Sequence, residues 1–230
     1  MQKLKQIYRS SYAGEQVVTS LTLENNEWIP ETEYVPNSVF NTHTTTQAIV
    51  FGNGESRNDF NLDHIKNHKG GLFGVDRLQS YGCNNFYKEF TPDFLVAVGD
   101  ATVEELANST YPDDNIVYVN GEHVVKYPSK FYLIPQNVSY DAGAIAAYMA
   151  CFDGHKKVYL LGYDGYTVDD ENNTSAFWLN TLLTVIGTYS DVDFVRVMPT
   201  REYSCASELL SQPNFRQIDY RDFVLEADIG

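Results

Sequence analysis

From Gln47 onward the sequence alternates between short β-branched or aromatic runs and longer segments with helical patterning. Such an alternation predicts a largely parallel sheet whose strands are joined by crossover helices. We therefore expect residues 47–230 to form a Rossmann-like α/β domain, with a mostly parallel sheet and helices on both faces. The expected strands are 48–51, 78–83, 94–98, 116–119, 131–134, 158–163 and 194–197; the expected helices are 62–67, 103–108, 142–152, 175–189 and 206–210, with a last turn at 221–225.

The segment 142–152 carries the strongest helix signal. Asp141 is a suitable N-cap, the residues that follow are small and apolar almost all round, and Gly154 ends the run. A helix that is apolar on every side is buried, and the strand at 158–163 is its expected neighbour. This unit ends in Asp164 at the carboxyl edge of the sheet, where ligands bind in open α/β folds.

Residues 1–46 differ in pattern from the domain, and we expect them to form an N-terminal β-hairpin arm. Two apolar runs, 16–23 and 28–29, flank a polar turn, which is a hairpin signal. Pro30, Pro36 and the threonine-rich residues 42–46 then predict an extended arm or linker. An isolated hairpin is only marginally stable in water, so the arm is expected to pack on the domain or on a partner.

Composition and charge argue against several classes of partner. The formal net charge of −15 repels nucleic-acid phosphates and anionic membranes, and no basic run offsets it. The sequence contains no run that could span a membrane, and its start has no apolar core of signal-peptide length. Cys83, Cys151 and Cys205 lie far apart without a CxxC motif, which is typical of a reduced protein without structural zinc.

The loop Gly52-Asn53-Gly54, which follows the first strand of the domain, is the first candidate for a binding site. Glycine allows backbone angles closed to other residues and lets a ligand approach the main chain closely. Asn53 tolerates the same geometry and carries both a donor and an acceptor. The motif is neither a P-loop nor a dinucleotide fingerprint, and a tight turn is the preferred interpretation when it is taken alone.

Four motifs occur in order along the chain: Gly52-Asn-Gly-Glu-Ser56, Gly82-Cys-Asn-Asn-Phe-Tyr87, Ala142-Gly143 before a small-residue helix, and Leu161-Gly-Tyr-Asp-Gly-Tyr166. Over residues 47–170 this order resembles the bacterial sialyltransferases that use CMP-sialic acid and, more loosely, the flagellin-modification glycosyltransferase-like proteins. The resemblance implies a metal-independent donor pocket for a nucleotide sugar, in which asparagines bond the nucleotide and sugar and a tyrosine hydroxyl contacts the leaving phosphate. The residues that it implies for this pocket are Asn53, Gly54, Asn84, Gly143 and Tyr166.

Two positions differ from the family pattern. Ala142 stands where the family has a serine, and no histidine follows His155, although the family's general base is a histidine beyond the last motif. Since a sugar hydroxyl is a poor nucleophile until its proton is removed, loss of the base should lower the rate by roughly 10²–10⁴-fold. The carboxylates near the last motif are Asp164, Asp169, Asp170 and Glu171, and such an acidic run is also typical of a solvated loop. The catalytic candidates that the sequence leaves are Asp164 and Tyr166.

Metal and cofactor signals are weak. Asp191-Val-Asp193 matches the Asp-x-Asp of metal-dependent glycosyltransferases, but it lies between an expected helix and an expected strand. Aspartates commonly serve as caps and turn formers there, so we interpret the motif as a turn. No metal and no resident cofactor are expected, and a nucleotide sugar would be a substrate.

A second resemblance covers nearly the whole chain, including the arm. Tyr81-Gly-Cys-Asn, Phe90-Thr-Pro-Asp-Phe94 and the run from Cys151 to Gly162 are similar to segments of proteins encoded by tailed phages of marine cyanobacteria. This resemblance implies a phage protein, located in the virion or in the host cytoplasm.

Two functional classes follow from these observations. The first is a virion-associated structural or accessory protein that keeps a sialyltransferase-like domain without its base, and whose arm contacts other virion proteins or a second copy. The alternative is a metal-independent glycosyltransferase that uses a CMP- or similar nucleotide-activated sugar. The absent histidine, Ala142 and the arm favour the first class, whereas Asn53, Asn84 and the Asp-x-Tyr motif favour the second. Fold alone does not decide between them.

Overall fold

The structure, a computed structural model, describes residues 2–7, 15–36, 46–68, 78–134, 139–164 and 173–230. Eight strands form the central sheet in the order β11-β10-β9-β4-β5-β6-β7-β8, and every neighbouring pair is parallel. The strands are β4 (Gln47–Phe51), β5 (Gln79–Cys83), β6 (Phe94–Val96), β7 (Ile116–Val119), β8 (Tyr132–Leu133), β9 (Lys157–Leu161), β10 (Asp193–Met198) and β11 (Phe215–Asp219). The Rossmann-like α/β prediction is confirmed.

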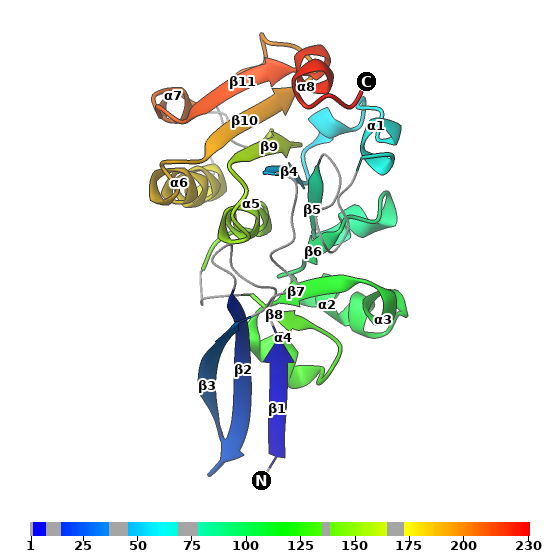
Figure 1. Cartoon of the computed structure of the whole chain (residues 1–230), viewed down its shortest axis with the longest axis vertical. Coiled ribbons are helices and arrows are strands. Elements are labelled where there is room, and N and C mark those ends of the chain that lie inside the picture. Colours follow the sequence, from blue (N-terminus) through cyan, green and yellow to red (C-terminus); the bar gives the residue numbers. More distant parts are fainter. Residues whose placement is uncertain (1, 8–14, 37–45, 69–77, 135–138, 165–172) are drawn as a thin grey trace.

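The strand order contains one reversal, between β4 and β9. The chain enters the sheet at β4, adds β5 to β8 on one side, and then returns to place β9, β10 and β11 on the other side. Figure 1 shows this path as a change from cyan and green strands to yellow-green and red ones across the sheet. Loops that leave neighbouring strands at such a switch point run to opposite faces and open a crevice at the carboxyl ends of the strands.

Helices cover both faces of the sheet (Figure 1). On one face lie α5 (Ala142–Phe152), α6 (Asn173–Thr188) and α7 (Ser207–Leu210); on the other lie α1 (Asp63–Lys66), α2 (Asp100–Ala107), α4 (Gly121–Lys126) and α8 (Tyr220–Glu226). Side chains alternate along β4: Ala48 and Val50 pack in the core with α5, while Ile49 and Phe51 pack in the core with α8. Three short helices complete the set: the 3₁₀ helices η1 (Glu55–Arg57) and η2 (Asn84–Lys88), and α3 (Tyr111–Asp114).

Several elements differ from the predicted ones. The sequence analysis missed β11, which is an edge strand and therefore has buried residues only at Phe215 and Ile218. It also missed α3 and α4, which are short and begin with residues that favour turns. The strand expected at 158–163 ends at Leu161, because Gly162 takes a left-handed backbone angle of φ +77°.

The N-terminal residues form a three-stranded antiparallel sheet of β1 (Gln2–Ile7), β2 (Glu15–Glu24) and β3 (Glu27–Pro36). The predicted hairpin is confirmed as β2–β3, and its turn residues Asn25 and Asn26 have φ of 49° and 67°, as a type I′ turn requires. β1 is a third strand that was not predicted. Of the two alternatives for Pro30 and Pro36, an extended arm or a linker, the structure has the extended arm: both belong to β3, an edge strand, where proline is tolerated. Figure 1 shows this sheet projecting from the β8 end of the body, where β1 contacts β8.

Two further expectations concern membranes and thiols. None of the helices in the described ranges is long and apolar enough to cross a membrane.

All three cysteines are free, and Cys83 and Cys151 are buried. Burial raises the pKa of the Cys151 thiol well above its usual value, so this thiol is protonated and acts as a small apolar side chain.

Candidate functional site

A pocket of about 310 Å³ opens where β4, β5 and β9 end, at the switch point of the sheet. Its size is at the lower end of the range for small-molecule sites. Five segments contribute to it: the loop after β4, the end of β5, the start of α5, the turn after β9, and α6. Its lining residues are Gly52, Asn53, Gly54, Cys83, Asn84, Asp141, Ala142, Gly143, Gly162, Tyr163 and Trp178.

The turns after β4 and β9 are joined tightly by their main chains. The Gly52 N–H donates to Leu161 O at 2.8 Å, and the Gly54 N–H donates to Gly162 O at 2.9 Å, so the β4–β9 pairing continues into the turns. A Cβ atom on Gly52 would lie 2.4 Å from Gly162 O, and one on Gly54 would lie 2.5 Å from the Asp164 carboxyl carbon. Glycine is required at 52 and 54 because two turns approach each other here.

The predicted special backbone angles at these glycines are wrong. Gly54 has φ of −67°, and among the described glycines only Gly154 and Gly162 have left-handed angles. The close neighbour that a Cβ at Gly52 or Gly54 would meet is the chain after β9. Their main chain still lines the pocket together with the Asn53 side chain.

Asp164 holds together the turn after β4 and the turn after β9. It is absent from the lining of the pocket among the residues that the structure describes. Its Oδ2 accepts a hydrogen bond from the Ser56 backbone N–H at 2.7 Å, and its Oδ1 accepts one from the Ser56 hydroxyl. Nearby, the Arg57 Nε donates to Gly52 O at 2.9 Å, while its terminal nitrogens pair with Glu89. The geometry gives Asp164 a structural contact rather than a place at the pocket surface.

Both predicted asparagines line the pocket, and each uses its side-chain carbonyl to hold a neighbour. Asn53 Oδ1 accepts from the Cys83 thiol with an S···O distance of 3.6 Å, and Asn84 Oδ1 accepts from the Val98 N–H at 3.3 Å. Asn84 also has φ of 48°, a left-handed angle that is uncommon outside glycine and clusters at functional sites. With the carbonyls engaged, the amide NH₂ groups are the parts of these side chains that suit an acceptor on a ligand.

The start of α5 forms another wall of the pocket. Asp141 caps this helix through Oδ1, which accepts from the Ala144 N–H at 3.1 Å, and its Oδ2 accepts from the Thr181 hydroxyl of α6 at 2.6 Å. The N–H groups of Ala142 and Gly143 occupy the first two helical positions, which have no partner inside a helix. Both residues line the pocket, so α5 presents its N-terminus there.

The titratable side chains of the described lining differ in charge. Burial, followed by repulsion from Asp141, raises the pKa of the Cys83 thiol to about 12, so this thiol is neutral at pH 7 and does not act as a nucleophile. The Tyr163 hydroxyl donates to Gly143 O at 2.8 Å. Asp141 is thus the one charged side chain among the lining residues that the structure describes.

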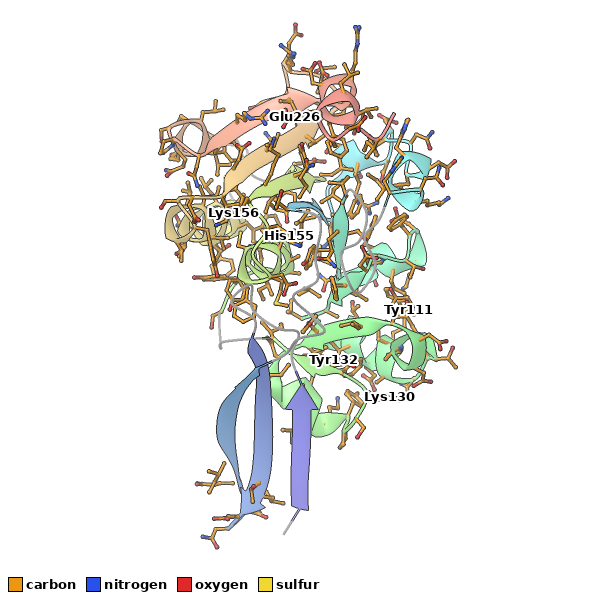
Figure 2. The ribbon with its side chains drawn as sticks, viewed as in Figure 1. Tyr111, Lys130, Tyr132, His155, Lys156 and Glu226 are labelled. Carbon is orange, nitrogen blue, oxygen red and sulfur yellow. The ribbon has the colours of Figure 1, made fainter. Side chains whose placement is uncertain are left out.

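No histidine in the described ranges lines the pocket. His155 is buried near the amino ends of β5 and β9, with its Nε2 3.2 Å from the Tyr81 hydroxyl and 2.8 Å from Gln79 Oε1 (Figure 2). His123 lies 2.9 Å from Asp100 Oδ1. Outside the described residues lie His43, Tyr166, Asp169, Asp170 and Glu171.

Two acidic groups are relevant to metal binding, and neither belongs to the pocket. The possible ligand atoms of Asp100, Glu122 and His123 lie within 4.8 Å of one another at the ends of β6 and β7, but the two carboxylates are exposed. In the Asp191-Val-Asp193 motif, Asp191 lies in a turn and pairs with Lys156 at 2.5 Å, while Asp193 is the first residue of β10. This arrangement agrees with the interpretation of the motif as a turn.

No family model, curated protein or solved structure matches this chain. The two resemblances seen in the sequence therefore stay predictions, and function has to be inferred from the pocket.

Sequence reasoning placed Asn53, Gly54, Asn84 and Gly143 near one another, and the structure brings all four to one pocket. Several other lining residues had no predicted role in the site, among them Asp141, Cys83 and Trp178. Asp141 was recognised only as a cap and Cys83 only as a reduced thiol, although Cys83 directly precedes Asn84 and Asp141 lies two residues before Gly143. Trp178 had no signal in the sequence, because its place depends on how α6 packs.

Proposed function

We propose that this chain binds a nucleotide-activated sugar, such as a CMP-linked sugar, in the switch-point pocket and transfers the sugar to a hydroxyl acceptor. The observation that carries the proposal is the convergence of Asn53, Asn84 and the start of α5 on one open pocket. These residues come from three separate parts of the chain, and the switch point is where α/β sheets bind their ligands.

The hydrogen-bonding character of the pocket supports this class of ligand. The amide groups of Asn53 and Asn84 and the main-chain N–H groups of Ala142 and Gly143 are all neutral donors. A nucleotide sugar is rich in matching acceptors, including phosphate, base carbonyl and hydroxyl oxygens.

Trp178 adds a flat apolar surface to one side of the pocket. Its side chain is 40% exposed and lines the pocket from α6, whereas the adjacent Phe177 is 49% exposed and is absent from the described lining. Aromatic side chains in such positions stack on nucleobases and sugar rings. We therefore assign Trp178 to contact with the ring of the base or the sugar.

Trp178→Ala is expected to weaken the binding of CMP by roughly 5- to 30-fold, since stacking on an aromatic contributes about 1–2 kcal/mol per base. Isothermal titration of CMP and CMP-N-acetylneuraminate measures this directly. Phe177→Ala is the matched control, because it removes an equally exposed aromatic from the same helix, and its affinity should stay within about twofold of the original protein. Equal losses in both variants, or no binding by the unaltered protein, would count against the proposal.

The N-terminal sheet favours a second candidate function, assembly with other virion proteins or with a second copy of the chain. Three strands project from the body and meet it at β8, and Ile29 on the outer strand β3 is 47% exposed (Figure 1). An exposed apolar group on a projecting sheet suits protein contacts. If the chain is a virion protein of a tailed phage, as this candidate holds, mass spectrometry of the purified particles should detect it, and its absence from them would remove this candidate.

A further inference from the structure

We infer that Asp141 is the general base that accepts the proton of the acceptor hydroxyl during sugar transfer. This inference rests on the proposed function, because it names the group that performs the proton transfer in the same pocket. It also addresses the absence of the histidine that the sequence resemblance leads one to expect.

The other lining side chains are unsuited to act as the general base. The carboxamides of Asn53 and Asn84 are not bases, and the buried Cys83 thiol stays protonated near neutral pH. The Tyr163 hydroxyl already donates its proton to Gly143 O at 2.8 Å. Among the lining residues that the structure describes, Asp141 is therefore the side chain that can accept a proton at pH 7.

Asp141 lines the pocket together with Cys83, and repulsion from its charge adds to the burial that raises the pKa of the Cys83 thiol. The Cys83 thiol in turn contacts the Asn53 side chain at 3.6 Å. Asp164, the carboxylate that the sequence suggested, is bound instead by the backbone and hydroxyl of Ser56.

Two hydrogen bonds from different helices hold the carboxylate in one orientation. The Ala144 N–H of α5 binds Oδ1 at 3.1 Å, and the Thr181 hydroxyl of α6 binds Oδ2 at 2.6 Å. Thr181 Oγ1 also lies 2.9 Å from Trp178 O, the backbone carbonyl three residues earlier in α6. A base held in this way is pre-organised for proton transfer.

The transfer step balances without any further reagent. The acceptor oxygen forms a bond to the anomeric carbon while its proton passes to a carboxylate oxygen of Asp141. The bond between the anomeric carbon and the phosphate oxygen breaks, and its electron pair leaves with the nucleoside monophosphate. Water can take the place of the acceptor, and the product is then the free sugar. Carboxylates activate water in this manner in inverting glycosidases.

The test measures CMP binding by titration calorimetry and CMP release from CMP-N-acetylneuraminate by chromatography, with the full chain. Asp141→Asn is expected to bind CMP at least as tightly as the original protein, because it removes a negative charge from the pocket, but to lower kcat by roughly 10²–10⁴-fold. Asparagine is as good an N-cap as aspartate, so α5 should remain intact. Asp141→Ser is a second variant with a good cap and no carboxylate, and it should show the same loss. Thr181→Val should lower kcat less, with KM unchanged.

The outcomes separate this inference from the proposed function. Equal CMP release by the original protein and by Asp141→Asn or Asp141→Ser would overturn the role of Asp141. Binding of CMP by the original protein without any release of CMP from the donor would also overturn it, while leaving the binding proposal in place. Failure of the original protein to bind either CMP or the donor would refute the proposed function, and the inference with it.

Discussion

Gly52→Ala is expected to destabilise the protein by roughly 3 kcal/mol, at the upper end of the usual cost of overpacking. The added Cβ would lie 2.4 Å from the carbonyl oxygen of Gly162 and 3.1 Å from its carbonyl carbon. Both atoms belong to the main chain of a turn that is hydrogen-bonded to the loop after β4. A main-chain neighbour cannot rotate away, so the two turns at the floor of the pocket must separate. Urea denaturation followed by circular dichroism measures the change.

Gly187→Ala is the matched control for this prediction, and the expected change has the opposite sign. Gly187 lies in α6, is exposed, and has no atom within 4 Å of an added Cβ. Alanine in a helix interior is more favourable than glycine by about 0.5–1 kcal/mol, so this variant should be more stable than the original protein. A destabilisation of Gly52→Ala below about 0.5 kcal/mol, within the scatter of surface substitutions, would contradict the described contact between the turns.

Glu226→Gln is expected to reduce stability at pH 7 by about 1–2 kcal/mol, since solvent screens these partly exposed ion pairs. Glu226 Oε1 accepts hydrogen bonds from Arg216 at 2.5 Å, Lys157 at 2.9 Å and Tyr159 at 3.1 Å, and thereby ties the end of α8 to β9 and β11 (Figure 2). Burial alone would raise the pKa of Glu226, but these hydrogen bonds outweigh it and lower the pKa to about 2. The neutral amide keeps the shape of the side chain and loses the charge.

The pH dependence of this effect follows from the direction of the shift. The folded-state pKa of Glu226 lies below the usual value of 4.5, so its contribution is fully present above pH 4.5 and is lost as the pH falls toward 2. The difference between the original protein and Glu226→Gln, measured by urea denaturation, should therefore shrink between pH 5 and pH 3. The control is Glu202→Gln, which alters an exposed carboxylate and should change stability by less than about 0.5 kcal/mol at either pH. A difference for Glu226→Gln that does not vary with pH would contradict this account.

The central elements of the fold could be predicted from the sequence because their signals are strong and local. β7 and α5 have the predicted bounds, since a continuous apolar run and a capped small-residue helix leave little ambiguity. β11 was missed because an edge strand buries few of its residues and lacks a continuous apolar pattern. β1 was missed because its Gln-Lys-rich sequence becomes a strand only by pairing with β2. Tertiary pairing, and not local propensity, decides these two strands.

The candidate site was predictable to the extent that it depends on the ends of strands. Asn53 and Asn84 each follow a predicted strand, and parallel strands bring such positions to one edge of the sheet. The reason for Gly52 and Gly54 was not predictable, because it depends on the distance between two turns that are far apart in the sequence. The same applies to Trp178, which reaches the pocket through the packing of α6 on α5. Tyr166 lies outside the described residues and stays a prediction.

The most direct test of the central claim is an amide chemical-shift titration of the isotope-labelled protein with CMP. The account predicts saturable shifts concentrated at Gly52 to Gly54, Asn84, Ala142 and Gly143, together with the indole N–H of Trp178. Residues on the projecting sheet and at the β11 edge should remain unchanged. Shifts confined to those distant regions, or no shifts at millimolar CMP, would contradict a nucleotide site at the switch point of the sheet.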